Sequence, residues 1–308
     1  MVRSAAKNYN DVTVITSADQ YQELIHEMNR NNGATSLNFR EKLSRTAFTE
    51  TAYYDSIISS YFNKKANIHL PDKKVFSANL IEKLRYGENP HQFSGYYSKN
   101  LKTNLKQIHG KQLSYNNYND IFAALTISKS LPKNKGTVIV KHANPCGVSI
   151  LKNNLNSYKS ALACDPISAF GGIVACNFKV TESIASELSK IFLEVVIANS
   201  FNKKALKILK RKKNLRIIDI SNYKIKNHTS IKSFDGSFLV QSKDNIVIDK
   251  KKLKCVTKLK PNKKELAEIE FAFNICKYVK SNAIVLCNNF STIGIGAGQP
   301  SRLDSCKI

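Results

Sequence analysis

A lysine and a histidine stand side by side at the end of an apolar run, and their chemistry is complementary. The run 136–140 predicts a buried strand, Lys141 and His142 follow it directly, and Pro145 and Gly147 favour a turn. Polar residues at such a strand end are well placed to face a cleft. A histidine can serve as general base while a lysine stabilises a developing oxyanion, which suits acyl transfer to a weak nucleophile. The alternative is a histidine that only caps a turn.

Two other chemistries of the same segment have weaker support. A zinc deaminase requires H-x-E followed by P-C-x-x-C, but Ala143 and Asn144 follow His142, and no second cysteine follows Cys146 at that spacing. Cys146 could act as a nucleophile with His142, yet a spacing of four residues across a proline turn gives no reason for hydrogen-bond geometry. We therefore favour the lysine–histidine pair.

The segment 84–92 carries groups that bind phosphate or carboxylate. Arg85 offers a planar fork of donors, and Tyr86 offers a face for stacking. Asn117 and Asp120 add an amide and a carboxylate before an expected helix. An ordinary asparagine-rich helix start explains these two residues equally well.

Two further segments are rich in glycine. The turn 165–172 contains Phe170 and Gly171 and precedes an expected strand, so its glycines permit close approach of the backbone to a ligand. The segment 294–299 has three glycines but not the G-x-G-x-x-G spacing, and no acidic residue lies about 20 residues further on. We reject NAD binding.

The apolar pattern predicts an α/β layered chain of roughly two domains. A polar stretch at 63–74 predicts an interdomain connection. Strands are expected at 12–16, 136–140, 173–176, 195–198, 215–220 and 283–287, and helices at 17–29, within 36–62, and at 120–129, 181–192 and 266–279. Ser17 with Gln20, and Asn262 with Glu265, are typical helix-capping pairs.

The chain is strongly basic, with 48 Lys and Arg against 23 Asp and Glu and a net charge of +25. The stretch 201–264 holds 20 of these basic residues and 4 of the acidic ones. It lacks the interleaved aromatic residues of a groove that binds nucleic acid. We interpret it as a solvated surface and expect no nucleic-acid partner. A nucleotide- or nucleic-acid-binding module on this stretch is the alternative.

Other features of the composition exclude further classes of protein. The seven cysteines form no C-x-x-C pair, which argues against a disulfide framework or a zinc knuckle and predicts buried thiols. No window reaches the 18 or so apolar residues of a membrane span, and Met1 is not followed by a secretory leader. We expect a cytoplasmic protein with no membrane partner.

Six motifs together resemble the family of bifunctional purine-synthesis enzymes that combine AICAR transformylase with IMP cyclohydrolase. They occur in the order of the family and span most of the chain. They are LRYGENPHQ at 84–92, QLSYNN at 112–117, VKHANPCG at 140–147, DPISAFGG at 165–172, SNAIV at 281–285 and IGIGAGQPSR at 293–302.

The resemblance implies a domain organisation and a reaction. Residues 75–308 would be a transformylase domain with two subdomains similar to the cytidine deaminase fold but without zinc. Residues 65–74 would be the linker, and 1–64 the end of a cyclohydrolase domain. The reaction implied moves a formyl group from 10-formyltetrahydrofolate to the amine of AICAR, with no metal, in a homodimer.

The resemblance also implies roles for the matched residues. His142 helps remove the amine proton, Lys141 supports charge on the formyl oxygen or the folate, and Asn282 orients the formyl group. The substrate-binding residues implied are Arg85, Tyr86, Asn117, Asp120, Phe170 and Gly171.

The first residues resemble a family segment that takes part in ring closure. Its lysine corresponds to Lys7, which is therefore the candidate for the cyclohydrolase reaction. The family has further cyclohydrolase groups before this segment and further transformylase groups after the motif that ends the chain. We expect a fragment in which transformylase residues are largely present and cyclohydrolase residues largely missing, with little or no activity in isolation.

Overall fold

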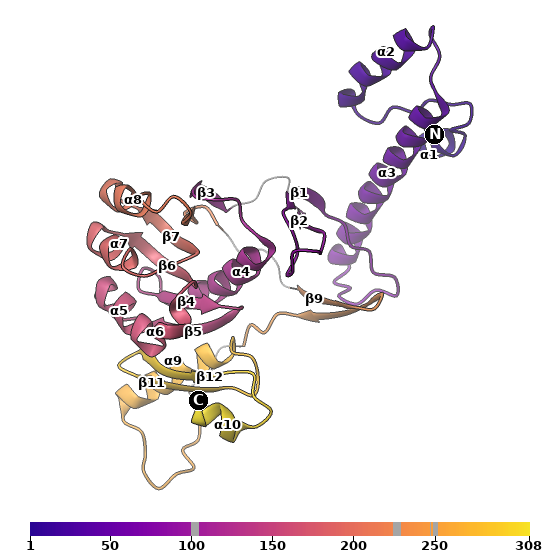
Figure 1. Ribbon diagram of the computed structural model, residues 1–308. Coiled ribbons are helices and arrows are strands. Elements are labelled where there is room, and N and C mark those ends of the chain that lie inside the picture. The colour runs from indigo at the N-terminus through magenta and orange to yellow at the C-terminus, as the bar shows by residue number, and fades with distance from the viewer. Residues whose placement is uncertain (100–104, 224–228, 247, 249–251) are drawn as a thin grey trace. The chain divides into compact units, whose positions relative to one another are not determined.

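The computed structural model describes residues 1–99, 105–223, 229–246, 248 and 252–308 (Figure 1). The chain divides into two compact units, one of residues 1–81 and 97–101 and the other of residues 82–96 and 102–308. The linker predicted at 65–74, between the two domains that the resemblance implies, stays a prediction. None of the helices in the described part of the chain has both the length and the apolar character needed to cross a bilayer.

The smaller unit is helical. Its elements are α1 (Val2–Lys7), the 3₁₀ turn η1 (Ala18–Gln20), α2 (Tyr21–Arg30) and α3 (Leu37–Lys65). Ser17 and Gln20 form the expected capping box, and Ser36 caps α3 through the N–H of Phe39. The strand predicted at 12–16 is wrong, because this segment pairs with no described strand. Its Val14 instead packs into a small core with Leu43 of α3.

The larger unit contains an eight-stranded mixed sheet. The order of its strands is β11-β12-β5-β4-β6-β7-β8-β3. The pairs β6–β7 and β7–β8 are parallel, and the other neighbours are antiparallel. The strands are β3 (Lys106–His109), β4 (Thr137–Lys141), β5 (Asn144–Ser149), β6 (Ile173–Val180), β7 (Val195–Phe201), β8 (Arg216–Asp219), β11 (Ile284–Asn288) and β12 (Ser291–Gly296). Two short hairpins, β1 (Asn79–Leu84) with β2 (Ser94–Ser98) and β9 (Thr229–Phe234) with β10 (Ser237–Ser242), complete the strands.

Helices cover both faces of this sheet (Figure 1). One face packs against α4 (Tyr115–Ser130) and α9 (Lys263–Cys276), and the other against α5 (Asn154–Cys164), α7 (Glu182–Leu188) and α8 (Lys203–Leu209). Neighbouring residues of β4 alternate between the two cores, since Val138 and Val140 face α4 while Ile139 lies in the other cluster. The mixed α/β class predicted from the sequence is confirmed.

A buried asparagine connects the sheet to the segment before β4. Asn177 of β6 is 4% exposed. Its Oδ1 accepts the N–H of Gly136 at 2.7 Å, and its Nδ2 donates to the carbonyl oxygens of Ser128 at 3.2 Å and Pro132 at 2.9 Å. Because this one buried side chain bonds three backbone groups between residues 128 and 136, it fixes the loop that enters β4.

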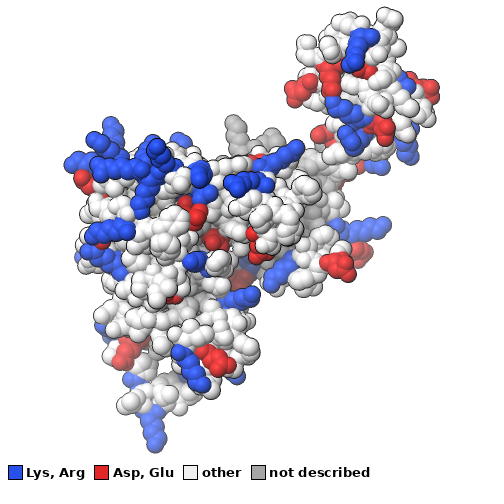
Figure 2. Space-filling view, in the orientation of Figure 1, with Lys and Arg blue, Asp and Glu red and all other residues white. Residues whose placement is uncertain are grey.

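The basic stretch contributes an exposed surface on one edge of the larger unit. Figure 2 shows Lys and Arg gathered over α7 and α8. Exposed residues of this surface are Lys203, Lys204, Lys207, Lys210 and Arg211. Lys204 pairs with Glu182 at 3.3 Å, an exposed ion pair that contributes little to stability.

Candidate active site

Lys141 and His142 lie at the junction of an antiparallel hairpin formed by β4 and β5. The two residues of the hairpin turn are His142 and Ala143, with φ of 52° and 59°. Positive φ at both central positions is typical of the turn that best matches the twist of two paired strands. The predicted Pro–Gly turn is therefore wrong. Pro145 and Gly147 lie within β5, beside a shift of register that accommodates a residue without an N–H.

The hairpin turn is bound to α4 through a carboxylate. Asp120 Oδ1 accepts the N–H of Ala143 at 2.7 Å, and Oδ2 accepts the N–H of His142 at 3.3 Å. Burial raises the pKa of Asp120, and the two hydrogen bonds act in the opposite direction. The structure thus brings together two of the predicted site residues, Asp120 and His142.

Lys141 reaches the turn that the sequence singled out at 165–172. Its Nζ donates to the carbonyl oxygen of Phe170 at 2.8 Å. Phe170 ends the short helix α6 (Pro166–Ala169), which Asp165 caps through the N–H of Ser168. Gly171 has φ of 73° and donates its N–H to Phe192 at 2.8 Å. Only glycine adopts that φ without strain, so the motif residue has a structural reason.

Asn282 belongs to a third segment of the larger unit. Its Nδ2 donates to the carbonyl oxygens of Gln299 at 3.1 Å and Pro300 at 2.7 Å, so the motifs at 281–285 and 293–302 lie together. Asn144 connects this segment to the hairpin. Its Oδ1 accepts the N–H of Lys280 and its Nδ2 donates to the His142 carbonyl, both at 3.3 Å.

The loop after β1 contacts the start of α4. The Arg85 guanidinium lies 5.2 Å from the ring centre of Tyr86, and Asn116 donates to the carbonyl of Glu88 at 3.3 Å. Asn117 is buried, and it forms a capping box with Ser114 in which its Oδ1 accepts the Ser114 N–H at 3.1 Å. The interpretation of Asn117 as a helix-capping residue is therefore confirmed, and its role toward a substrate stays a prediction.

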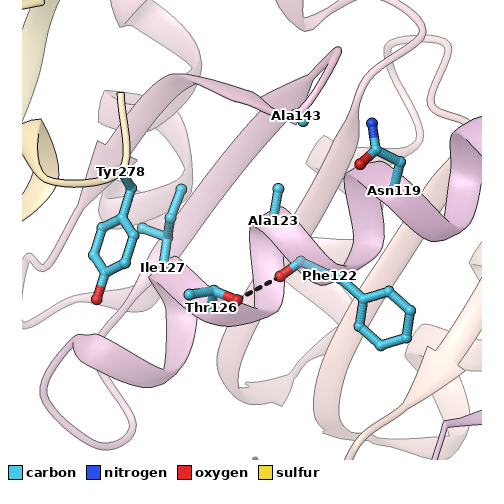
Figure 3. A pocket seen from close by; sticks show the side chains of 7 residues that line it. All are labelled: Asn119, Phe122, Ala123, Thr126, Ile127, Ala143 and Tyr278. Atoms are coloured by element: carbon cyan, nitrogen blue, oxygen red, sulfur yellow. Dashed lines mark hydrogen bonds between the residues drawn. The ribbon is translucent and has the colours of Figure 1, made fainter. Parts of the chain in front are cut away.

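A cavity of about 310 Å³ adjoins the hairpin turn (Figure 3). Its lining residues come from the turn, from one side of α4 and from the segment after α9. They are Asn119, Phe122, Ala123, Thr126, Ile127, Ala143 and Tyr278. The Thr126 hydroxyl donates to the Phe122 carbonyl at 2.7 Å, which leaves the lining largely apolar.

Comparison with known proteins identifies the family. A family model described as the AICARFT/IMPCHase bienzyme matches residues 5–308. The chain belongs to this family. The resemblance inferred from the six motifs is confirmed.

Three named relatives in the family are longer than this chain. The protein of Bradyrhizobium diazoefficiens named "Bifunctional purine biosynthesis protein PurH" is 43% identical over 317 residues, covering 100% of this chain and 60% of the relative. Relatives with the same name from Bartonella tribocorum and a Thermoanaerobacter species are each 44% identical, covering 100% and 98% of this chain and 59% and 60% of their own lengths. The chain thus spans about 60% of the length of the curated relatives it matches.

The alternative nucleophile in the hairpin is disfavoured by its surroundings. Cys146 is 9% exposed, and its thiol donates to the Ile139 carbonyl at 3.6 Å. Burial raises the pKa of Cys146 to about 12. A thiol that stays protonated in an apolar core is a poor nucleophile, so these surroundings disfavour Cys146 in that role.

Other predicted chemistry is placed elsewhere or finds no support in the structure. Lys7 ends α1 in the smaller unit and is exposed. Gly294 and Gly296 lie in β12 rather than in a phosphate-binding loop, which supports the rejection of NAD binding. Among residues 1–99, 105–223, 229–246, 248 and 252–308, no three His, Cys, Asp or Glu side chains group as metal ligands would.

Two residues at the site were not predicted from the sequence. Asn144 lies inside a recognised motif, but its partner Lys280 is 136 residues away, so no local pattern announces the contact. Tyr278 reaches the cavity from the end of α9 and has no distinguishing signal in sequence.

Proposed function

We propose that this chain catalyses formyl transfer from 10-formyltetrahydrofolate to the amine of AICAR, a step of purine biosynthesis. The observation that carries the proposal is the hairpin turn that presents Lys141 and His142 next to the 165–172 turn, with Asn282 tied to the same hairpin through Asn144. Family membership supplies the substrate class, because the matched model is the AICARFT/IMPCHase bienzyme.

The reaction proposed has a simple balance. The amine nitrogen of AICAR attacks the formyl carbon, a C–N bond forms, and the bond from that carbon to the folate nitrogen breaks. His142 accepts the proton lost by the amine, and the folate nitrogen gains a proton. Lys141 stabilises negative charge on the formyl oxygen, and Asn282 orients the formyl group.

Binding of the two substrates is assigned to the surrounding loops. Arg85, Tyr86 and Asn117 bind the nucleotide, with the Arg85 fork suited to its phosphate. Phe170 and Gly171 shape the pocket on the Lys141 side. The apolar cavity walled by Phe122 and Tyr278 suits a flat heterocycle.

Several finer expectations remain part of this proposal. The larger unit has a cytidine deaminase-like subdomain arrangement, residues 1–64 are the end of a cyclohydrolase domain, and Lys7 is its ring-closure candidate. The protein works in the cytoplasm as a homodimer without nucleic acid.

The proposal is tested by following tetrahydrofolate and formylated AICAR in a mixture of the two substrates. The variants are Lys141→Met and, as a matched control, Lys135→Met, an exposed lysine just before the same strand. The sequence predicts little activity for the isolated chain, so we expect slow product formation from the wild type and the control, and a further loss of about 100-fold or more in Lys141→Met. Absence of product from the wild type, or equal rates in both variants, would contradict it.

A further inference from the structure

The contacts of Asp120 differ from the substrate-binding role that the resemblance implies. It lies in the second turn of α4, and each of its carboxylate oxygens accepts one backbone N–H of the hairpin turn, from Ala143 at 2.7 Å and from His142 at 3.3 Å. A carboxylate that receives two N–H groups in this way holds a backbone segment rather than a mobile side chain.

The hairpin turn needs such support because of its residue types. Both central residues have positive φ, which Asn-Gly or Asp-Gly adopts readily and His-Ala does not. The local sequence therefore does not favour the turn by itself. Its geometry is held by a tertiary contact, from Asp120 to the two N–H groups, and by a local contact from Asn144 to the His142 carbonyl.

We propose that Asp120 is a positioning residue for formyl transfer, acting through the backbone of the hairpin turn rather than by contact with substrate. By fixing that backbone, Asp120 sets the directions in which the Lys141 and His142 side chains leave the hairpin. The inference rests on the proposed function for its catalytic part, while the anchoring of the turn stands on the hydrogen bonds alone.

The sharpest substitution is Asp120→Asn, which keeps the size of the side chain but offers a single acceptor oxygen. One of the two turn N–H groups then faces an NH₂ group and loses its bond. We expect kcat to fall by about 10- to 100-fold, with the KM for AICAR and for the folate changed by less than about twofold. A residue that binds substrate would instead raise a KM.

A stability control separates positioning from general weakening of the fold. Asn202→Ala removes the side-chain cap of α8, whose Oδ1 accepts the Ala205 N–H. This variant should lose stability while keeping the wild-type kcat and KM. Asp120→Glu retains the charge at a different reach and should recover less than full activity, because the positions of the two oxygens matter.

A second measurement does not depend on catalysis. In the ¹⁵N-labelled 308-residue chain, at least one of the His142 and Ala143 amide protons should exchange at least about tenfold faster in Asp120→Asn than in the wild type and in Asn202→Ala. Unchanged exchange, or a raised KM with unchanged kcat, would overturn the inference. A wild type that forms no product would overturn the proposed function and the catalytic part, while the exchange rates would still decide whether Asp120 anchors the turn.

Discussion

Replacing Gly147 by alanine should break the packing of the hairpin against α5. A Cβ at this position would lie 1.9 Å from the carbonyl oxygen of Ala161, 2.8 Å from its carbonyl carbon and 3.4 Å from its Cα. All three are backbone atoms of α5, so no side chain can rotate away. The constraint is one of space, and it explains the last glycine of the motif at 140–147.

The cost follows from the movement required. An ordinary contact needs about 3.4 Å, so strand and helix must separate by about 1.5 Å. The fully buried Tyr158 and Ala161 of α5 would then lose part of their contact with the sheet. Overpacking a core typically lowers the free energy of unfolding by about 1–3 kcal/mol. Because the atoms in the way here are backbone atoms, we expect Gly147→Ala to cost about 3 kcal/mol, near the upper end of that range. The melting temperature should fall by roughly 6–12 °C.

Thermal unfolding followed by circular dichroism measures the effect. The matched control is Gly294→Ala, also in a strand, where the nearest atom to a new Cβ is Leu286 Cδ1 at 3.8 Å. That variant should stay within about 1 kcal/mol of the wild type. Equal melting temperatures for the two variants would refute the close approach of β5 and α5.

Three further outcomes are expected. Asn177→Asp places a carboxylate oxygen against two backbone carbonyls, so urea unfolding at neutral pH should show a loss of about 3 kcal/mol in the free energy of unfolding. Burial would raise the pKa of the new carboxyl, so lowering the pH should restore part of the stability. A variant as stable as the wild type at neutral pH would contradict the described bonds. Ala143→Gly should gain about 0.5–1 kcal/mol in thermal unfolding, because glycine adopts φ of 59° without strain, whereas a loss would argue against that conformation. At pH 8 a thiol reagent should label the exposed Cys255 quickly and spare the buried Cys146 and Cys176. Burial raises the pKa of both buried thiols to about 12, so about one such thiol in 10⁴ is ionised at this pH. Fast labelling of either buried thiol in native protein would be inconsistent with this burial.

The sequence predicts those strands that are continuous apolar runs. The cores of β4, β6 and β7 are found where expected, because each is buried on both faces and needs no polar alternation. β5 was missed, because Asn144, Pro145 and Gly147 are typical of turns and become a strand only beside β4. At 12–16 the opposite occurred, since residues with high strand propensity found no described partner strand.

At the site, too, local sequence patterns predicted some features, while contacts between distant segments were not predictable. Lys141 and His142 were recognised from their types and motif, and the structure places them beside Phe170 and Asp120. The position of the turn was not predictable, because His-Ala carries no turn signal and its support comes from a carboxylate 22 residues earlier. Contacts between segments this far apart follow from the fold as a whole.

We propose that the hairpin turn carries formyl-transfer chemistry with His142 as the proton acceptor. It is tested most directly by comparing the rate of AICAR formylation in the wild type and in His142→Ala, with AICAR binding measured in both. We predict slow product formation by the wild type, a rate lower by about 100-fold or more in His142→Ala, and similar AICAR binding. A wild type and a variant that form product at the same rate would contradict the claim.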